Sequence, residues 1–278
     1  MNDKLLITVA PCIPTYLAAG IPGLDLSPQG IVNEVISAYN AGANVVHLHV
    51  WDEYGKPTME THVFDQTIAM IRAQCDIIIE GSTGGFNELS PAEWSVALGM
   101  DIELASLNAG SVNYDQGVYI NSPQDIEYWA KEMHRRKIKP DISIFEAGMI
   151  SNSIELIEKG WIDPPFIYGF VLGQHGALPA TAKNVLFLHE SIPPNSVWSV
   201  VGHGGNDLTM SVLSMSMGGH ARAGFEDNPY YRPGEFAKSN AQLVERLVRI
   251  ARELGRDVAS PADVRQMLGM PARSKKPA

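Results

Sequence analysis

The sequence is short of positive charge. Its 278 residues contain 21 Lys and Arg against 31 Asp and Glu, which gives a formal net charge of −10. Binding to nucleic acid or to an anionic membrane surface needs concentrated positive charge, and the chain has no cluster of Lys or Arg that would supply it. We therefore expect neither nucleic acid nor a membrane among the partners of this protein.

Cysteine and long hydrophobic runs are scarce too. Cys12 and Cys75 are too few for a disulfide framework, so both are expected to be ordinary buried thiols in a reducing compartment. Pro11 and Pro14 break the apolar run near the N-terminus, and no signal-peptide pattern with a small-residue cleavage site follows it. No run reaches the roughly 18 to 20 apolar residues of a membrane span. These absences predict a cytoplasmic protein.

Short β-branched runs alternate along the chain with longer amphipathic stretches, and this alternation is typical of βα units around a parallel sheet. The predicted strands are 5–10, 44–50, 76–80, 102–107, 141–145, 166–172, 196–201 and 219–225. The predicted helices are 28–39, 63–74, one opening at Ser90–Pro91, 123–137, 151–159, 181–189, 207–217 and 234–254. Ser-Pro pairs at several of the helix starts supply an N-cap and a first-turn proline.

Eight βα units of roughly 35 residues each favour one closed (β/α)8 TIM barrel over two open domains. A doubly wound sheet is the main rival fold. The first βα turn lacks the G-x-G-x-x-G pattern of dinucleotide-binding sheets, which weakens that rival. We expect a single barrel domain over residues 1–278 that ends in a short loose tail from Arg273 to Ala278.

Catalytic groups of a barrel lie at the carboxyl ends of its strands, and the second predicted strand ends in His47-Leu-His49. Residues i and i+2 of a strand point to the same side, so His47 and His49 share a face. Two imidazoles side by side suit a divalent metal, most plausibly zinc. The alternative is that they are two unrelated polar residues.

The eighth predicted strand ends in a charged cluster. Arg222 and Glu226 share one face by the same alternation, and Asp227 follows directly. Charged groups at a strand mouth are costly unless they pair or bind something. Glu226 is a candidate third metal ligand, with Arg222 and Asp227 beside it for the chemistry. A purely structural Arg–carboxylate pair is the alternative.

Two further strand ends are small and polar. The run Ser82-Thr-Gly-Gly85 offers backbone N–H groups and hydroxyls to an anion, although Gly-Gly after a strand can also be only a turn. Ser106 lies at the end of the fourth predicted strand. His175 and His203 follow strands six and seven and are placed where they can line the mouth.

Seven stretches together resemble the β-keto acid cleavage enzyme family, in order and over nearly the whole chain. They are AGANVVHLHV (41–50), STGG (82–85), LNAG (107–110), FEAGM (145–149), FVLG (170–173), GGHARAGFEDN (218–228) and AKSNAQLVERLVRIARELGR (237–256). The resemblance implies a zinc-dependent (β/α)8 barrel that often assembles as a homotetramer. It also implies an acyltransferase reaction, in which a β-keto acid condenses with acetyl-CoA and is cleaved to acetoacetate and a new acyl-CoA.

The resemblance assigns roles to eight positions. It makes His47, His49 and Glu226 the metal ligands and Arg222 and Asp227 the catalytic pair, and it makes Ser82, Gly85 and Ser106 substrate-binding residues. Zinc would polarise the keto oxygen while Asp227, oriented by Arg222, removes a proton from the neighbouring carbon.

Three positions depart from relatives that cleave an amino substrate. Thr15 and Ser143 stand where those relatives have glutamates suited to an ammonium group, so an amino substrate is not expected, and Thr15 is a candidate substrate contact. Trp51 replaces an arginine, and its indole suits an apolar tail or a quaternary ammonium, or else packing at the barrel rim.

Two other functions are open at this point. One is a TIM-barrel metal-dependent hydrolase that does not use CoA, although such enzymes usually carry their His-x-His on the first strand. The other is a non-enzymatic small-molecule sensor, which Arg222 and Asp227 argue against.

Overall fold

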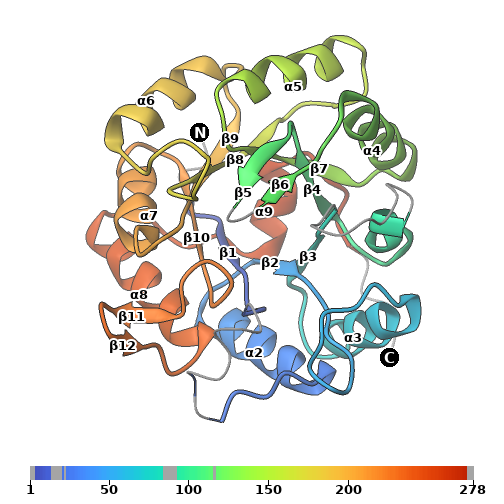
Figure 1. Cartoon of the computed structure of the whole chain (residues 1–278). Helices are drawn as coiled ribbons and strands as arrows, with labels where there is room; N and C mark the ends of the chain where they lie inside the picture. Colours follow the sequence, from blue (N-terminus) through green and yellow to red (C-terminus); the bar gives the residue numbers. More distant parts are fainter. Residues whose placement is uncertain (1–3, 14–20, 22, 84–92, 115–116, 274–278) are drawn as a thin grey trace.

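The computed structural model describes residues 4–13, 21, 23–83, 93–114 and 117–273. Eight strands in this part of the chain pair in parallel and close into a barrel, in the order β1-β10-β9-β8-β7-β4-β3-β2 (Figure 1). They are β1 (Ile7–Val9), β2 (Val45–Leu48), β3 (Ile78–Gly81), β4 (Leu104–Asn108), β7 (Lys139–Ile144), β8 (Ile167–Leu172), β9 (Val197–Gly202) and β10 (His220–Ala223). The predicted barrel is confirmed.

Helices surround the barrel (Figure 1). They are α2 (Pro28–Ala41), α3 (Thr61–Arg72), the 3-10 helix η1 (Glu93–Gly99), α4 (Pro123–Arg136), α5 (Gly148–Glu158), α6 (Ala182–Ser191), α7 (Asp207–Ser216) and α8 (Asn240–Glu253). Ser27 and Ser122 cap α2 and α4 as the Ser-Pro pairs predict. The predicted opening at Ser90–Pro91 lies outside the described residues. No helix in the described ranges is long and apolar enough to cross a membrane.

Two short hairpins and one short helix were not predicted. The last large helix, α8, begins at Asn240 and not at 234, because β11 (Tyr230–Arg232) and β12 (Glu235–Phe236) form an antiparallel hairpin first. A second hairpin joins β5 (Val112–Tyr114) to β6 (Gly117–Tyr119), and α9 (Pro261–Met267) follows α8. Strands of two or three residues carry too little periodicity to be recognised in a sequence.

The inside of the barrel divides into two halves along its axis. At the amino ends of the strands the side chains form a separate hydrophobic cluster, which we call the apolar half; it consists of Leu6, Val45, Ile78, Leu104, Ile167, Ala259, Val264 and Leu268. Val264 and Leu268 come from α9 and its end, and α9 lies across the far end of the barrel in Figure 1. The C-terminal helix therefore closes this end.

Two residues further along seven of the eight strands, the inward side chains become polar; on β8 the corresponding residue is Gly169. We call these residues the polar half; they are Thr8, His47, Glu80, Ser106, Asp141, Ser199 and Arg222, and all line one large cavity. Because side chains alternate with a period of two, each of these residues points to the same side of its strand as the residue two positions earlier. Thr8 thus follows Leu6 of the apolar half, and His47 follows Val45. The fold thus gathers its polar interior at the carboxyl ends of the strands.

Candidate active site

The cavity above the polar half has a volume of about 1920 Å³. Pockets for small ligands usually measure roughly 300 to 1,000 Å³. Its floor is formed by the strand ends, and its rim includes Trp51, the β5–β6 hairpin and the β11–β12 hairpin. The space is therefore larger than one small acid requires.

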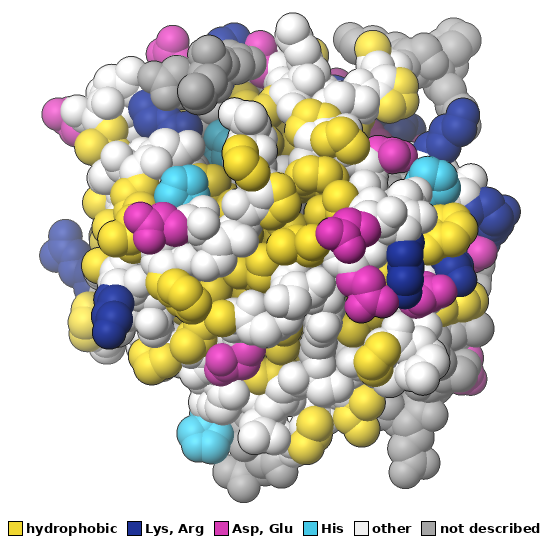
Figure 2. Space-filling view, turned by 90° about the horizontal axis from the view of Figure 1, so that it is seen from above, with side chains coloured by type: hydrophobic (Ala, Val, Ile, Leu, Met, Phe, Trp, Pro, Cys, Tyr) yellow, Lys and Arg dark blue, Asp and Glu magenta, His cyan; other side chains and the backbone are white. Residues whose placement is uncertain are grey.

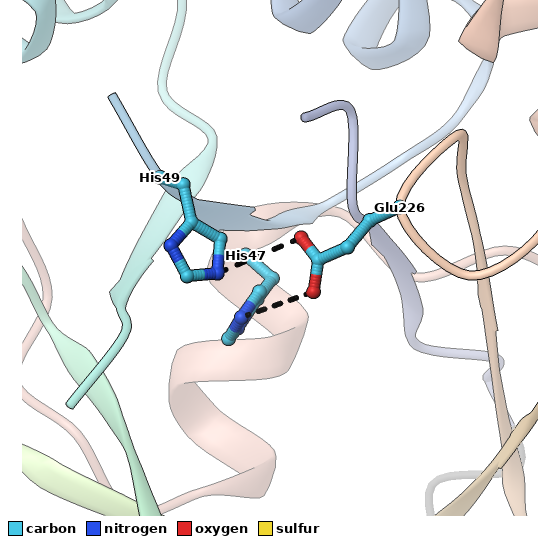
Figure 3. Close-up of side chains that lie close together, drawn as sticks. All are labelled: His47, His49 and Glu226. Carbon is cyan, nitrogen blue, oxygen red and sulfur yellow. Dashed lines mark ion pairs between the residues drawn. The ribbon is translucent and has the colours of Figure 1, made fainter. Parts of the chain in front are cut away.

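His47, His49 and Glu226 converge at the floor of this cavity (Figure 3). The two histidines project from β2 and its end, and the glutamate comes from the loop after β10. Nε2 of His47 lies 3.6 Å from Oε1 of Glu226, and Nε2 of His49 lies 3.8 Å from Oε2 of the same carboxylate. The structure thus brings together the three residues proposed from the sequence as metal ligands.

This triad fits a metal ion. One ligand atom from each of the three residues lies within 4.8 Å of the other two, where bonds of about 2.05 Å at tetrahedral angles would set them about 3.4 Å apart. Oε2 of Glu226 is buried and has no hydrogen-bond partner within the described chain, although unpartnered buried carboxylate oxygens are costly. Burial would raise the pKa of Glu226, but the charges of His47, Arg222 and His49 outweigh it and lower that pKa to about 2. The ligand carboxylate is therefore ionised at neutral pH.

Glu80 supports the triad from below. Its Oε1 lies 2.8 Å from Nδ1 of His47, and both side chains are buried. A carboxylate at Nδ1 keeps the proton there and leaves Nε2, the atom that faces Glu226, free to bind a metal. The hydrogen-bond partner of Glu80 is thus a metal-ligand histidine.

Arg222 and Asp227 form a bidentate ion pair beside the triad. Nε and Nη2 of Arg222 donate to the two carboxylate oxygens of Asp227, each at 2.8 Å, and Nη2 also donates to Oε1 of Glu226 at 2.8 Å. Burial alone would lower the pKa of Arg222, but the two carboxylates raise it well above its usual value. One permanent cation thus orients both acidic residues.

Two buried anchors fix the loop that carries Glu226 and Asp227. Before them, the amide of Phe225 donates to Oδ1 of Asn240, and Asn240 donates to Glu34. Gly224 is needed there, because a Cβ at this position would stand 2.0 Å from the carbonyl oxygen of Ala10.

After these residues, Nδ2 of Asn228 donates to Asp207 at 2.6 Å, and Arg246 donates to the other oxygen of Asp207 at 3.1 Å. Neither Asp207 nor Asn240 was predicted from the sequence. Both lie at helix starts, where polar residues are usual as caps, so their type alone gives no signal.

The expected substrate-binding positions are only partly described. Ser82 is half-buried and lines the cavity, and Oγ of buried Ser106 accepts a hydrogen bond from the amide of Thr83 at 3.0 Å. The turn that contains Ser82 is thereby fastened to β4. Thr15 and Gly85 lie outside the described residues.

Asp141 is a site residue that the sequence analysis missed. It lies on β7 with Ser143, both line the cavity, and its Oδ1 is buried with no hydrogen-bond partner in the described ranges. Burial and the negative charge of Glu80 raise the pKa of Asp141 to about 7, against the opposing charges of Arg222 and His47. The alternation of Lys139, Asp141 and Ser143 within one strand was the available signal.

Three further histidines and Trp51 lie either at the cavity or in the packing of the barrel. His175 and His203 line the cavity as expected, and burial lowers the pKa of His203. His220 belongs to the packing, since its Nδ1 accepts the amide of Leu6 at 3.1 Å. Trp51 is buried, lines the cavity and meets His49 edge-on with ring centroids 6.4 Å apart.

Comparison with known proteins adds a family and several named relatives. The sequence model of the family described as beta-keto acid cleavage enzyme matches residues 4–270. A 3-keto-5-aminohexanoate cleavage enzyme of Fusobacterium nucleatum is 39% identical over 272 residues, which cover 97% of this chain and 99% of that protein. A 3-oxoadipate:acetyl-CoA acetyltransferase of Cupriavidus necator is 33% identical, over 94% of this chain and 96% of the relative.

Among solved structures, a ternary complex of ObcA with a C4-CoA adduct and oxalate superposes with a TM-score of 0.75. The match covers 88% of this chain and 67% of that chain, at 19% sequence identity. At this identity the likeness shows the fold alone. It agrees with the closed barrel described above.

Proposed function

The chain belongs to the beta-keto acid cleavage enzyme family, and we propose that it is a zinc-dependent acyltransferase that condenses a β-keto acid with acetyl-CoA. The products are acetoacetate and a new acyl-CoA. The observation that carries the proposal is the joining of the His47–His49–Glu226 triad and the Arg222–Asp227 pair on one cavity floor. The names of the relatives, which include acetyl-CoA acetyltransferases, support the choice of co-substrate.

His47, His49 and Glu226 would hold the metal. Two imidazoles, one carboxylate and an open position form the ligand set of many catalytic zinc sites, and the unpartnered oxygen of Glu226 fits that role. A bound zinc ion supplies Lewis acidity, which polarises the keto oxygen of the substrate and acidifies the carbon between its keto and carboxylate groups.

Asp227 is the proposed general base. Asp227 lines the cavity, and its carboxylate accepts a proton from C2 of the β-keto acid while Arg222 holds it in place through two hydrogen bonds. The C2 carbanion then attacks the thioester carbon of acetyl-CoA, and the CoA thiolate leaves. Arg222 is placed to stabilise the negative charge that develops on oxygen in this step.

In the second stage of the reaction, the CoA thiolate returns to the substrate. The CoA thiolate attacks the original keto carbon of the adduct, and the bond between that carbon and C2 breaks. The electron pair of that bond stays on C2, which recovers its proton from Asp227. The original acyl group leaves as the new acyl-CoA, and C1 and C2 leave within acetoacetate, so the atoms balance.

The oligomeric state of the protein and its cellular compartment stay predictions. We expect a homotetramer, as the resemblance implies, and a place in the cytoplasm, as the sequence predicts. Figure 2 shows hydrophobic side chains across the centre of one face and Lys and Arg towards its edges. A broad exposed apolar surface of this kind is typical of a protein–protein interface, which supports an oligomer.

A substrate-panel assay tests the function. We expect protein loaded with zinc to consume acetyl-CoA and release acetoacetate and a new acyl-CoA with at least one β-keto acid, across amino, carboxylate and alkyl side chains. A chelator should abolish turnover, and zinc should restore it. Breakdown of a β-keto acid without CoA would favour the metal hydrolase, and no product across a broad panel would contradict the proposal.

A further inference from the structure

We propose that Arg232, on the β11–β12 hairpin at the cavity, binds the phosphate groups of acetyl-CoA. Arg232 belongs to a cluster of three arginines around the ring of Tyr231; the other two are Arg246, which also lines the cavity, and Arg249, which does not, and both lie on α8. Arg232 is the member that would contact phosphate directly. The inference rests on the proposed use of acetyl-CoA and adds to it the place where the nucleotide end is held.

The geometry of the cluster is compact. The guanidinium carbon of Arg246 lies 4.9 Å from the centre of the Tyr231 ring, and that of Arg232 lies 5.7 Å from it. Nη2 of Arg249 donates to the tyrosine hydroxyl at 3.2 Å. Three positive charges therefore surround one aromatic ring in a chain whose net charge is −10.

Only part of this positive charge is neutralised. Arg246 is buried and pairs with Asp207, but its Nε has no hydrogen-bond partner in the described ranges. Arg232 and Arg249 form no ion pair with any described residue. Among the described residues that line the cavity, the Lys and Arg side chains are Arg222, Arg232 and Arg246. Since Arg222 and Arg246 are held by carboxylates, Arg232 is the lining cation that is free to bind an anion.

The size of the cavity leaves room for a large second ligand. A volume of about 1920 Å³ exceeds what one small acid fills. Acetyl-CoA carries its thioester at one end of a long arm and its diphosphate and 3′-phosphate at the other. A thioester at the triad leaves the phosphates near the rim, where an exposed guanidinium forms paired hydrogen bonds with phosphate oxygens.

The test compares acetyl-CoA with a thioester that lacks phosphates. We expect Arg232→Gln to raise the KM for acetyl-CoA about tenfold, because one charge-assisted contact is lost. The KM for S-acetyl-N-acetylcysteamine and the KM for the β-keto acid should change less than about twofold. Arg232→Lys should recover part of the loss. Arg252→Gln, an exposed arginine of α8 outside the cavity lining, is the matched control and should leave all three constants unchanged.

Calorimetric titration with CoA separates this inference from the reaction itself. Binding that is tenfold weaker in Arg232→Gln than in the unaltered protein supports the phosphate site, even where no β-keto acid of a panel is turned over. An unchanged KM and affinity for CoA in Arg232→Gln would overturn the phosphate site while the reaction stands. Equal losses with both thioesters would also overturn it, and an unaltered protein that does not bind CoA would overturn both proposals.

Discussion

The two halves of the barrel interior are built on the same strands, two residues apart, yet they differ in almost every property. The apolar half is closed by α9 and packed from residues such as Leu104 and Ile167. The polar half opens into a large cavity and holds ionisable groups on four strands, namely His47, Glu80, Asp141 and Arg222. The comparison shows that a barrel can separate stability from chemistry along its axis.

The charges of the polar half explain why it needs a partner. Glu80, Asp141, Glu226 and Asp227 place four carboxyl groups around a single arginine, Arg222. Buried charges of one sign are costly unless they are neutralised. A dication at the triad would supply what Arg222 alone does not, whereas the apolar half needs no ligand.

The largest effect is expected from Asp227→Asn, which removes the proposed base and keeps the shape. We expect kcat to fall about 10²- to 10⁴-fold, because proton transfer from C2 is lost. Metal content and circular dichroism should not change, since the three ligands remain. Asp65→Asn on the exposed face of α3 serves as the control and should keep full activity. Near-normal turnover by Asp227→Asn would remove that residue from the chemistry.

The next largest effect is expected from a substitution that creates a cavity in the apolar half. Leu104→Ala truncates a fully buried side chain and should lower the free energy of unfolding by about 2 to 5 kcal/mol in a denaturant titration. Metal content and kcat of the folded molecules should stay normal, because the residue lies below the polar half. Leu186→Ala, at an exposed position of α6, should cost less than about 0.5 kcal/mol. A large loss of kcat in Leu104→Ala would mean that the two halves are coupled.

A third change probes the support under the triad. Glu80→Gln removes the negative charge at Nδ1 of His47, and we expect zinc affinity to fall about 10- to 100-fold in competition with a chelator. Glu190→Gln at the exposed end of α6 is the control. Unchanged zinc affinity in Glu80→Gln would show that this carboxylate does not support the metal ligand.

The smallest effect is a pH dependence that comes from His220, whose Nδ1 accepts a hydrogen bond from the amide of Leu6 in the apolar half. Burial and the charge of Arg256 lower the pKa of His220 to about 3, against 6.5 for an exposed histidine. The unfolded chain therefore binds a proton more readily, so the contribution of His220 is present above pH 6.5 and is lost as the pH falls towards 3.

Unfolding free energies measured at several pH values check this. Between pH 6 and 5, the unaltered protein should lose up to about 1.4 kcal/mol per pH unit more than His220→Asn, whose side chain does not titrate. Parallel pH curves for the two proteins would contradict a buried, neutral His220.

The sequence allows much of this comparison to be predicted, but not all of it. The alternation along β2 and β10 was enough to turn His47, His49 and Arg222 inward, because a period of two fixes which side chains face inward. Glu226 was expected on the same face, but β10 ends at Ala223, so Glu226 joins the histidines from the loop that follows and not through strand alternation. The barrel followed from counting βα units, since long alternating patterns average over local errors.

The missed features depend on contacts between distant residues. Asp141 was overlooked because the alternation of Lys139, Asp141 and Ser143 turns it inward but does not by itself mark a functional residue; its importance comes from Glu80 and Arg222 across the barrel. Asp207 and Arg246 are 39 residues apart, and their pairing follows only from the packing of α7 against α8. The roles of α9 and of the β11–β12 hairpin likewise come from tertiary position.

The central claim is that the polar half performs carbon–carbon bond exchange between a β-keto acid and acetyl-CoA. Acetyl-CoA labelled with ¹³C at the thioester carbon tests it most directly, with products followed by carbon NMR. The account predicts the label at C3 of acetoacetate and an unlabelled new acyl-CoA. Breakdown of the β-keto acid with labelled acetyl-CoA left intact would contradict it.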